Sequence, residues 1–220
     1  MRIFDIMGPV MVGPSSSHTA GACRMGLMAR AVLGEEPAVA EIRLHGSFAA
    51  TGRGHGTDRA IVAGILGMLP HDPRLREALE WAEAGGLQVS FANADLGGHV
   101  HPNTAEIRLT GRHGTHASVI ASSVGGGRAE VLEVDGFPVH FDLGRPTLFV
   151  FHRDQPGAVA DVARALADSR ANIAAMQVGR QKRGGEALMV IETDQPVPAS
   201  ALTAIRGLPE IFGARNADTT

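Results

Sequence analysis

The chain of 220 residues contains a single cysteine, Cys23. A disulfide needs two cysteines, and an iron–sulfur cluster is usually held by about four thiolates. The chain therefore forms no internal disulfide and holds neither a cluster nor a cysteine-rich zinc ion alone. Any chemistry that its own side chains perform must come from other residue types.

Aromatic residues and positive charge are also scarce. The sequence has 8 Phe, 1 Trp and no Tyr, although 44% of its residues are hydrophobic, so we expect a core of Ala, Val, Leu and Ile. The 20 Lys and Arg residues are outnumbered by 23 Asp and Glu residues, which gives a net charge of −3. Without a basic stripe or interleaved aromatic residues, nucleic acid is a poor candidate for a partner.

Long hydrophobic runs are missing as well. No apolar stretch approaches the ~20 residues of a membrane-spanning helix, and the N-terminus lacks the pattern of a signal peptide. We therefore expect no membrane association and a cytoplasmic location. The length suits one or two domains.

The first 142 residues mix helical and extended patterns. Apolar spacing predicts helices over about 17–33, 58–69 and 73–84, with Asp58 and Asp72 as caps of the second and third. Alternation predicts strands over 40–48, 87–93 and 104–110, and residues 115–142 are rich in β pattern with turns at 125–127 and 135–136. Because helices and strands do not strictly alternate, the sequence predicts an α+β domain.

A boundary is predicted at residues 143–146, and a compact pattern follows it. Strands are expected at 147–152, 172–179, 186–193 and 210–214. One helix begins after Pro156-Gly157 and carries a stripe of Val159, Val162, Ala163 and Leu166, and a second spans 198–206. The order β-α-β-β-α-β is that of a ferredoxin-like unit of about 70 residues.

The most informative motif is Gly-Pro-Ser-Ser-Ser-His-Thr at residues 13–19, where a turn leads into the first predicted helix. Free backbone N–H groups at a helix start favour anions, and the side chains add hydroxyl groups and the titratable His18. The lysine of a phosphate-binding loop is missing. The motif indicates a pocket for a small carboxylate; the alternative is an ordinary serine cap.

A second motif, Gly-Arg-Gly-His-Gly-Thr-Asp, occupies residues 52–58, and its glycines leave the His55 ring accessible in the predicted loop. An imidazole titrates at about pH 6.5, so His55 is our candidate for a general base. The spacing does not fit a dinucleotide fingerprint. The alternative is an exposed loop histidine.

The third motif, His-Val-His-Pro-Asn-Thr, occupies residues 99–104. A His-x-His spacing is compatible with a metal ligand pair, but no third ligand stands nearby in the sequence, so no metal site is assigned. Substrate hydrogen bonding by His101 and Asn103 is the preferred interpretation. Three His-bearing polar segments in one domain suggest one convergent site. The remaining histidines are expected at the surface: His45, His71, His113, His116, His140 and His152.

The second domain, residues 147–220, resembles the ACT regulatory domain. The resemblance rests on Arg-Asp-Gln-Pro-Gly at 153–157 and Ala-Asn-Ile at 171–173. ACT domains usually pair with another copy and often bind amino acids, which implies a homo-oligomer and an effector site. The alternative is that these residues only turn the chain. The implied effector-binding residues are Asp154, Gln155, Gly157, Asn172 and Ile173.

The three motifs and the trailing ACT domain together resemble the beta chain of bacterial iron–sulfur-dependent L-serine dehydratase, with residues 1–144 as its α+β domain. The resemblance implies deamination of L-serine to pyruvate and ammonia without pyridoxal phosphate. It also implies a separate alpha chain with a 4Fe-4S cluster whose open iron acts as a Lewis acid on the hydroxyl.

By the same resemblance, His55, His18 and Thr57 are the catalytic residues, and His55 takes the proton from the α-carbon. A rival interpretation is a serine-sensing regulatory subunit without catalytic residues. A requirement for a monovalent cation stays open. The implied substrate-binding residues are Ser15, Ser16, Ser17, Thr19, His101 and Asn103.

Overall fold

The computed structural model describes residues 15–142 and 144–217. Gly13 and Pro14 of the first motif and Leu143 of the predicted boundary lie outside the described residues. The chain divides into two compact units between Leu132 and Glu133. Helices and strands are mixed in the way that the sequence predicts for an α+β protein. In the described residues, no helix is long and apolar enough to cross a membrane.

The first unit contains six helical segments in its described residues, 15–132. Two of them are not α-helical: a π-helical turn precedes the first α-helix, and a 3-10 segment precedes the last. Asp72 caps the 3-10 segment, as predicted, and its side chain accepts a hydrogen bond from the Arg74 N–H. Their bounds are η2 Ser16–Gly21, α1 Ala22–Leu33, α2 Gly46–His55, α3 Thr57–Ile65, η3 Pro73–Glu77 and α4 Ala78–Ala84.

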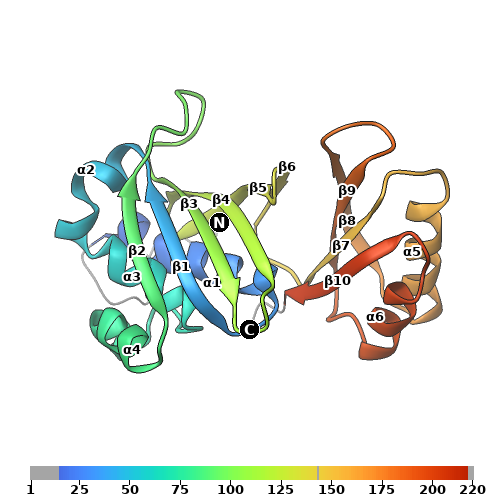
Figure 1. Ribbon diagram of the computed structural model, residues 1–220, viewed down its shortest axis with the longest axis horizontal. Helices are drawn as coiled ribbons and strands as arrows, with labels where there is room; N and C mark the ends of the chain where they lie inside the picture. Colours follow the sequence, from blue (N-terminus) through green and yellow to red (C-terminus); the bar gives the residue numbers. More distant parts are fainter. Residues whose placement is uncertain (1–14, 143, 218–220) are drawn as a thin grey trace, which may run out of the picture. The chain divides into compact units, whose positions relative to one another are not determined.

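A six-stranded sheet with the order β2-β1-β3-β4-β5-β6 backs these helices, and α1 and α3 lie on one of its faces (Figure 1). β1 pairs in parallel with β2, because α2, α3 and α4 carry the chain across between them, and antiparallel with β3. Its strands are β1 Pro37–Leu44, β2 Gln88–Asn93, β3 Thr104–Gly111, β4 His116–Gly125, β5 Arg128–Val134 and β6 Phe137–Phe141.

Two glycines let α1 and α3 cross in close contact. A Cβ added at Gly26 would lie 2.1 Å from the carbonyl oxygen of Ile61, and one at Gly64 would lie 2.0 Å from that of Cys23. No side chain larger than hydrogen fits between the two backbones. The crossing fixes the distance between two motifs, because η2 runs directly into α1 and α3 begins at Thr57.

The predicted strand over 40–48 is wrong at its end. β1 stops at Leu44, and the chain turns through Gly46, with φ of 54°, into α2, a helix that the sequence analysis did not predict. Its buried anchor is Phe48, which is fully inaccessible to solvent. With Gly46, Gly52 and Gly54 in ten residues, α2 has little helix propensity of its own, so tertiary packing decides its conformation.

The predicted cap of α3 is also wrong. Gly56, with φ of 72°, is the residue that precedes the first turn, and no side chain caps the helix. Asp58 lies inside the first turn, where its Oδ1 accepts a hydrogen bond from the Arg59 N–H at 2.9 Å. A positive φ at this position favours glycine, so the backbone conformation of Gly56, rather than a side-chain cap, sets the start of α3.

Within the second unit, β6 belongs to the six-stranded sheet, and residues 147–217 have the predicted βαββαβ order. The four strands of this segment form an antiparallel sheet with the order β10-β7-β9-β8, and α5 and α6 cover one face (Figure 1). The bounds are β7 Thr147–Arg153, α5 Ala158–Asp168, β8 Ile173–Arg180, β9 Glu186–Thr193, α6 Ala199–Arg206 and β10 Ile211–Ala217.

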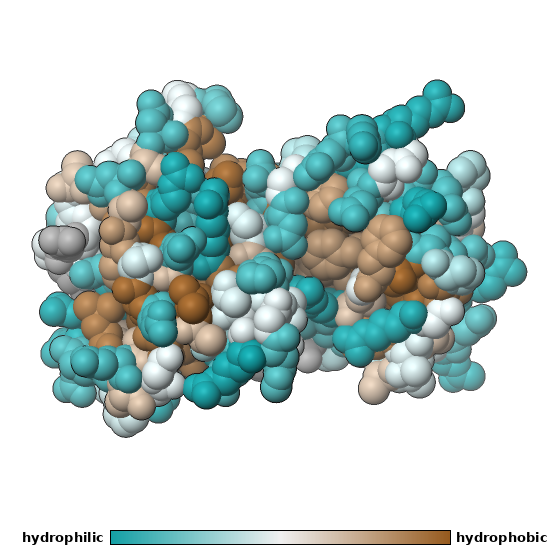
Figure 2. Space-filling view, in the orientation of Figure 1, coloured by the Kyte–Doolittle hydropathy of each residue, from teal (hydrophilic) through white to brown (hydrophobic). Residues whose placement is uncertain are grey.

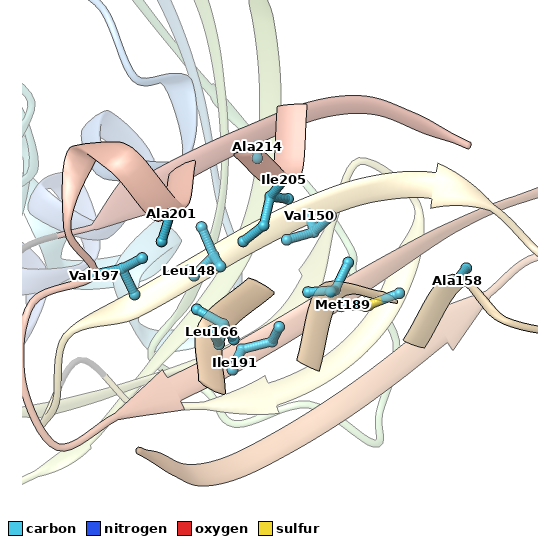
Figure 3. Close-up of a cluster of buried hydrophobic side chains, with 11 residues drawn as sticks. Leu148, Val150, Ala158, Leu166, Met189, Ile191, Val197, Ala201, Ile205 and Ala214 are labelled. Carbon is cyan, nitrogen blue, oxygen red and sulfur yellow. The ribbon is translucent and has the colours of Figure 1, made fainter. Parts of the chain in front are cut away.

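Aliphatic side chains fill the space between this sheet and its helices (Figure 3). Leu148 and Val150 of β7 and Met189 and Ile191 of β9 meet Leu166 of α5, and all five are inaccessible to solvent. The predicted stripe of α5 is confirmed by the burial of Val162 and Leu166, although Val159 is 41% exposed. His152 is buried at 2% exposure, so its predicted place at the surface is wrong.

Hydrophilic residues cover much of the face shown in the space-filling view, and hydrophobic residues are scattered among them (Figure 2). Of the large apolar side chains, Phe212 is 54% exposed and Trp81 is 46% exposed. The guanidinium group of Arg74 lies over the Trp81 indole ring, with its central carbon 5.8 Å from the ring centre.

Candidate active site

The first motif forms a wide turn around Ser15. Ser15 has extended backbone, and its side chain accepts a hydrogen bond from the His18 N–H at 3.3 Å, while its carbonyl accepts from the Thr19 N–H at 2.9 Å. One of the three serines is thus a cap, as the alternative interpretation expects. The turn also carries the His18 ring, which is half-buried.

Four hydroxyl groups surround the His18 ring. Its Nδ1 lies 3.3 Å from the Oγ atoms of both Ser15 and Ser17. Its Nε2 lies 3.4 Å from Ser47 Oγ and 3.3 Å from Thr51 Oγ1, both on α2. Both ring nitrogens therefore have hydroxyl partners that can donate or accept.

Burial lowers the pKa of His18 below its ordinary value of 6.5, and the neighbouring His55 lowers the pKa further. Burial removes the water that stabilises a charged imidazole, and a second imidazole nearby repels that charge when it is itself protonated. The uncharged form of the His18 ring is therefore favoured at pH 7. A neutral ring has one N–H donor and one lone pair, so its two sides must differ in role.

His55 is the last residue of α2, at the end of a helix and not in the predicted loop. Its ring is exposed, and its centre lies 4.9 Å from the centre of the His18 ring. Its Nδ1 lies 3.1 Å from the carbonyl oxygen of Thr51. A carbonyl only accepts, so this contact requires the hydrogen on Nδ1 and leaves a lone pair on Nε2 of the neutral ring.

The third motif reaches the same region through its backbone. The Pro102 carbonyl accepts from the Ser47 N–H at 2.8 Å, at the start of α2. Buried Ser123 of β4 donates its N–H to the Asn103 carbonyl at 2.9 Å and its hydroxyl to the Ser17 carbonyl at 2.8 Å. The structure thus ties the first and third motifs to one another. The side chain of His101 stays in its own loop, where Nδ1 accepts from the Asn103 N–H at 3.0 Å.

Two threonines of the motifs are buried without partners. Thr19 is 2% exposed and Thr57 is inaccessible, and neither Oγ1 has a hydrogen-bond partner within the part of the chain that the structure describes. Nearly all buried hydroxyl groups in proteins are paired, so such exceptions call for an explanation. Ser16 is half-buried in the same turn.

Sequence reasoning missed three residues of this cluster: Ser47, Phe48 and Thr51. The edge of the Phe48 ring meets His18 at a centroid distance of 5.2 Å and an angle of 69°. The signal that could have found the others is the spacing of Ser47, Thr51 and His55, four residues apart along one helical face. It was hidden because residues 40–48 alternate like a strand.

The sequence of the chain is similar to those of known protein families and of individual relatives. The family model of the serine dehydratase beta chain matches residues 2–84, and that of the ACT domain matches residues 146–210. The probable L-serine dehydratase beta chain of Bacillus subtilis is 43% identical over 96% of this chain and 94% of its own length. The chain belongs to the L-serine dehydratase beta chain family. The beta chain of Peptoniphilus asaccharolyticus is 37% identical over 96% of both chains.

A protein of another class shares part of the sequence. D-3-phosphoglycerate dehydrogenase of Synechocystis is 32% identical over 72% of this chain but only 28% of its own length. All three motifs of the candidate site lie in the part of the chain common to the L-serine dehydratase beta chain relatives, which spans nearly its whole length.

In the ACT domain, the predicted effector residues make internal contacts. Asp154 Oδ2 accepts from the Gly184 N–H and from Arg180 Nη1, both at 2.9 Å, and the hydrogen bond from Gly184, followed by that from Arg180, lowers the pKa of Asp154. Asn172 Nδ2 donates to Asp194 Oδ2 at 2.6 Å. These contacts join the turns at the ends of the strands.

The other predicted effector residues lie nearby in the same domain. Gly157, with φ of 99°, precedes α5 in a conformation that favours glycine. Gln155 is exposed, and its carbonyl accepts from the Ala158 N–H at 3.4 Å. Ile173 is half-buried and packs against the core of the domain.

The lone cysteine of this beta-chain family member is unsuited to hold a metal cluster. Cys23 is inaccessible to solvent, its Sγ donates to the Met68 carbonyl at 3.2 Å, and burial raises its pKa to about 12. Metal ligation needs the thiolate, which this environment disfavours. Over residues 15–142 and 144–217, no three His, Cys, Asp or Glu side chains gather closely enough to hold a metal ion.

Proposed function

We propose that this chain is the beta subunit of an L-serine ammonia-lyase, which converts L-serine to pyruvate and ammonia together with an alpha chain. The observation that carries the proposal is the meeting of His18 and His55, with the hydroxyl groups around them, in a chain of the L-serine dehydratase beta chain family. The activity named for the relatives needs a base and a place for a small amino acid, and this cluster offers both.

His55 is the base of the proposed reaction. Its Nδ1–H bond to the Thr51 carbonyl leaves the Nε2 lone pair on an exposed ring, where a substrate α-hydrogen can reach it. His18 is held by its hydroxyl contacts and stays neutral, so it is suited to orient the substrate beside His55. The proton moves from the α-carbon to His55 Nε2 as the substrate hydroxyl leaves.

The substrate carboxylate is proposed to bind among hydroxyl and backbone N–H donors. Thr19 and Thr57 supply buried hydroxyl groups with unused hydrogen-bonding capacity, and Thr57 lies at the positive end of the α3 dipole. Ser15, Ser16, Ser17, His101 and Asn103 complete the proposed substrate-binding set from the adjoining segments. Hydroxyl and amide donors bind an anion without burying an opposing charge.

The 4Fe-4S cluster is proposed to lie on the alpha chain and to supply a Lewis acid for the departing hydroxyl. The residues of this chain do not fit such a cluster, because their one thiol is buried and protonated. Pyridoxal phosphate is proposed to take no part: it needs a lysine for its Schiff base, and the sequence has one lysine, Lys182, in the exposed turn before β9 of the ACT domain. A monovalent cation stays an open requirement.

Two further features belong to the proposal. The ACT domain is proposed to pair with a second copy and thereby to form a homo-oligomer of alpha–beta pairs. The cytoplasm is the proposed location. No membrane or nucleic-acid partner is proposed.

The test is co-expression of this chain with the alpha chain, purification without oxygen, and an assay for pyruvate from L-serine. We expect turnover only when both chains are present. An alpha chain that is fully active alone would overturn the proposal that this chain supplies the base.

The similarity to D-3-phosphoglycerate dehydrogenase of Synechocystis favours one second candidate, a serine-sensing subunit without catalytic residues. The two candidates differ at saturating L-serine. Replacement of His55 lowers the maximal turnover if the residue is the base. It changes only the serine concentration needed for activation if the chain is a sensor.

A further inference from the structure

Thr51 lies between the two histidines of the candidate site. Its Oγ1 is 3.3 Å from His18 Nε2, and its carbonyl oxygen is 3.1 Å from His55 Nδ1. The residue is exposed on α2 and belongs to none of the three sequence motifs. One residue thus contacts one nitrogen of each ring.

The single hydrogen of the Thr51 hydroxyl is already in use. Thr51 Oγ1 donates to the Ser47 carbonyl at 2.9 Å, one turn earlier in α2. A hydroxyl group has one hydrogen and two lone pairs, so Thr51 offers only a lone pair to His18. Their contact is a hydrogen bond when His18 Nε2 carries the ring hydrogen.

The other side of His18 agrees with this assignment. With the hydrogen on Nε2, Nδ1 of the neutral ring must accept. Ser15 Oγ lies 3.3 Å from it and already accepts from the His18 N–H, so the Ser15 hydroxyl hydrogen is available to donate to Nδ1. Ser17 Oγ, also 3.3 Å from Nδ1, can donate to it as well, and Ser47 Oγ, 3.4 Å from Nε2, can accept beside Thr51. The hydrogen bonds then run in one direction, from the serines through His18 to Thr51.

We propose that Thr51 is a positioning residue that holds His18 as the Nε2–H tautomer through its hydroxyl and His55 as the Nδ1–H tautomer through its carbonyl. The two neutral rings then carry their hydrogens on opposite nitrogens, and His55 keeps Nε2 free to accept a proton. The importance of this arrangement for catalysis rests on the proposed function. The assignment of the two tautomers rests only on the hydrogen bonds and does not depend on that function.

The first test uses the full chain alone, with histidine ring nitrogens observed by two-bond ¹H–¹⁵N correlation. Spectra of His18→Gln and His55→Gln assign the two rings. Thr51→Val keeps the shape and the carbonyl but removes the hydroxyl, so we expect His18 to lose its preference for Nε2–H while His55 is unchanged. Thr51→Ser should restore the wild-type spectrum of His18.

Thr203→Val is the matched control, because Thr203 is an exposed helix residue of the ACT domain whose Oγ1 donates to the Ala199 carbonyl at 2.9 Å and, among the described residues, contacts no histidine. It should leave both rings unchanged. If Thr51→Val loses its native amide dispersion, Thr51→Ala gives the same test. Wild-type His18 with its hydrogen on Nδ1, or a His18 spectrum that Thr51→Val leaves unaltered, would overturn the proposal.

The second test measures turnover of the complex with the alpha chain. Thr51→Val should lower kcat about fivefold to tenfold, the effect of one neutral hydrogen bond, and Thr51→Ser should stay within about twofold of wild type. Equal kcat values for the valine variant and wild type would remove the catalytic consequence. A complex without turnover in any variant, including wild type, would contradict the proposed function instead, because the tautomer spectra need no activity.

Discussion

Replacement of Gly26 by alanine should separate α1 from α3. The added Cβ would lie 2.1 Å from the Ile61 carbonyl oxygen, 2.8 Å from the Ile65 nitrogen and 3.0 Å from the Gly64 Cα, all of them backbone atoms. An ordinary contact is 3.4 Å or longer, so the helices must move apart by about 1 Å. A gap of this size forfeits a quarter to a half of each dispersion contact along the crossing.

We expect Gly26→Ala to lower the free energy of unfolding by about 3 kcal/mol, the upper end of the cost of overpacking, because backbone cannot yield by changing a rotamer. The variant should also lose activity at temperatures where it stays folded. The turn that carries His18 precedes α1, and the segment after His55 begins α3, so the two rings would separate with the helices.

The assay is urea unfolding followed by fluorescence. Trp81, the one tryptophan of the sequence, lies in α4, so its signal reports on the first unit. Gly54→Ala is the control: it lies in a helix, and its added Cβ would meet nothing within 4 Å, so we expect a gain of about 0.5–1 kcal/mol. Equal stabilities of the two variants within about 0.5 kcal/mol would show that the close crossing of α1 and α3 at Gly26 does not limit the size of the side chain there.

Three further predictions concern single side chains. Cys23 of the native chain should react with a thiol reagent far more slowly than in urea, because burial raises its pKa to about 12; equal rates would contradict its burial. The Arg74 side chain holds the pKa of Asp72 down at about 2, so native stability should fall as the pH drops from about 4 to about 2; acid titration of Asp72→Asn should lack that part of the loss. Ser123→Ala removes the hydroxyl donor of the Ser17 carbonyl and should lower stability by about 1–2 kcal/mol in the urea assay while raising the KM for L-serine; a variant with wild-type values would show that this tie does not hold the turn.

The ACT domain could be predicted from the sequence almost element by element. Its strands and helices have regular apolar patterns, and residues such as Leu148, Leu166 and Ile191 face one core. Local pattern and tertiary structure agree there. The last strand differs most in extent, running from Ile211 to Ala217 where 210–214 is predicted, while the other strands and the last helix agree within one residue at each end.

Helix α2 could not be predicted in this way, because its stability comes from distant contacts. Phe48 is buried under neighbouring elements, and the backbone of Gly46 packs so closely on Pro102 that an added Cβ would lie 2.6 Å from the Pro102 carbonyl oxygen. Glycine and threonine give the segment little helix propensity. The same error concealed Ser47 and Thr51, since the predicted strand ends at residue 48 and leaves Thr51 and His55 in a loop, where no shared face with Ser47 is expected.

Several residues of the candidate site could be predicted from the sequence, but their positions relative to one another could not. Residue types identified His18 and His55, whereas their meeting depends on the glycine crossing of α1 and α3, which periodicity does not reveal. The predicted role of His101 and Asn103 side chains stays a prediction. Their backbone contacts place the loop against α2 and β4, which no local pattern could indicate.

The most direct test of the central claim is the turnover of His55→Gln in the complex with the alpha chain. It is measured at saturating L-serine, with the iron content matched to wild type. His113→Gln, at an exposed turn outside the site, is the control. We expect a loss of at least about 100-fold in kcat for His55→Gln, the size of a general base contribution, and less than about twofold for His113→Gln. Near-normal kcat for His55→Gln would mean that His55 is not the base.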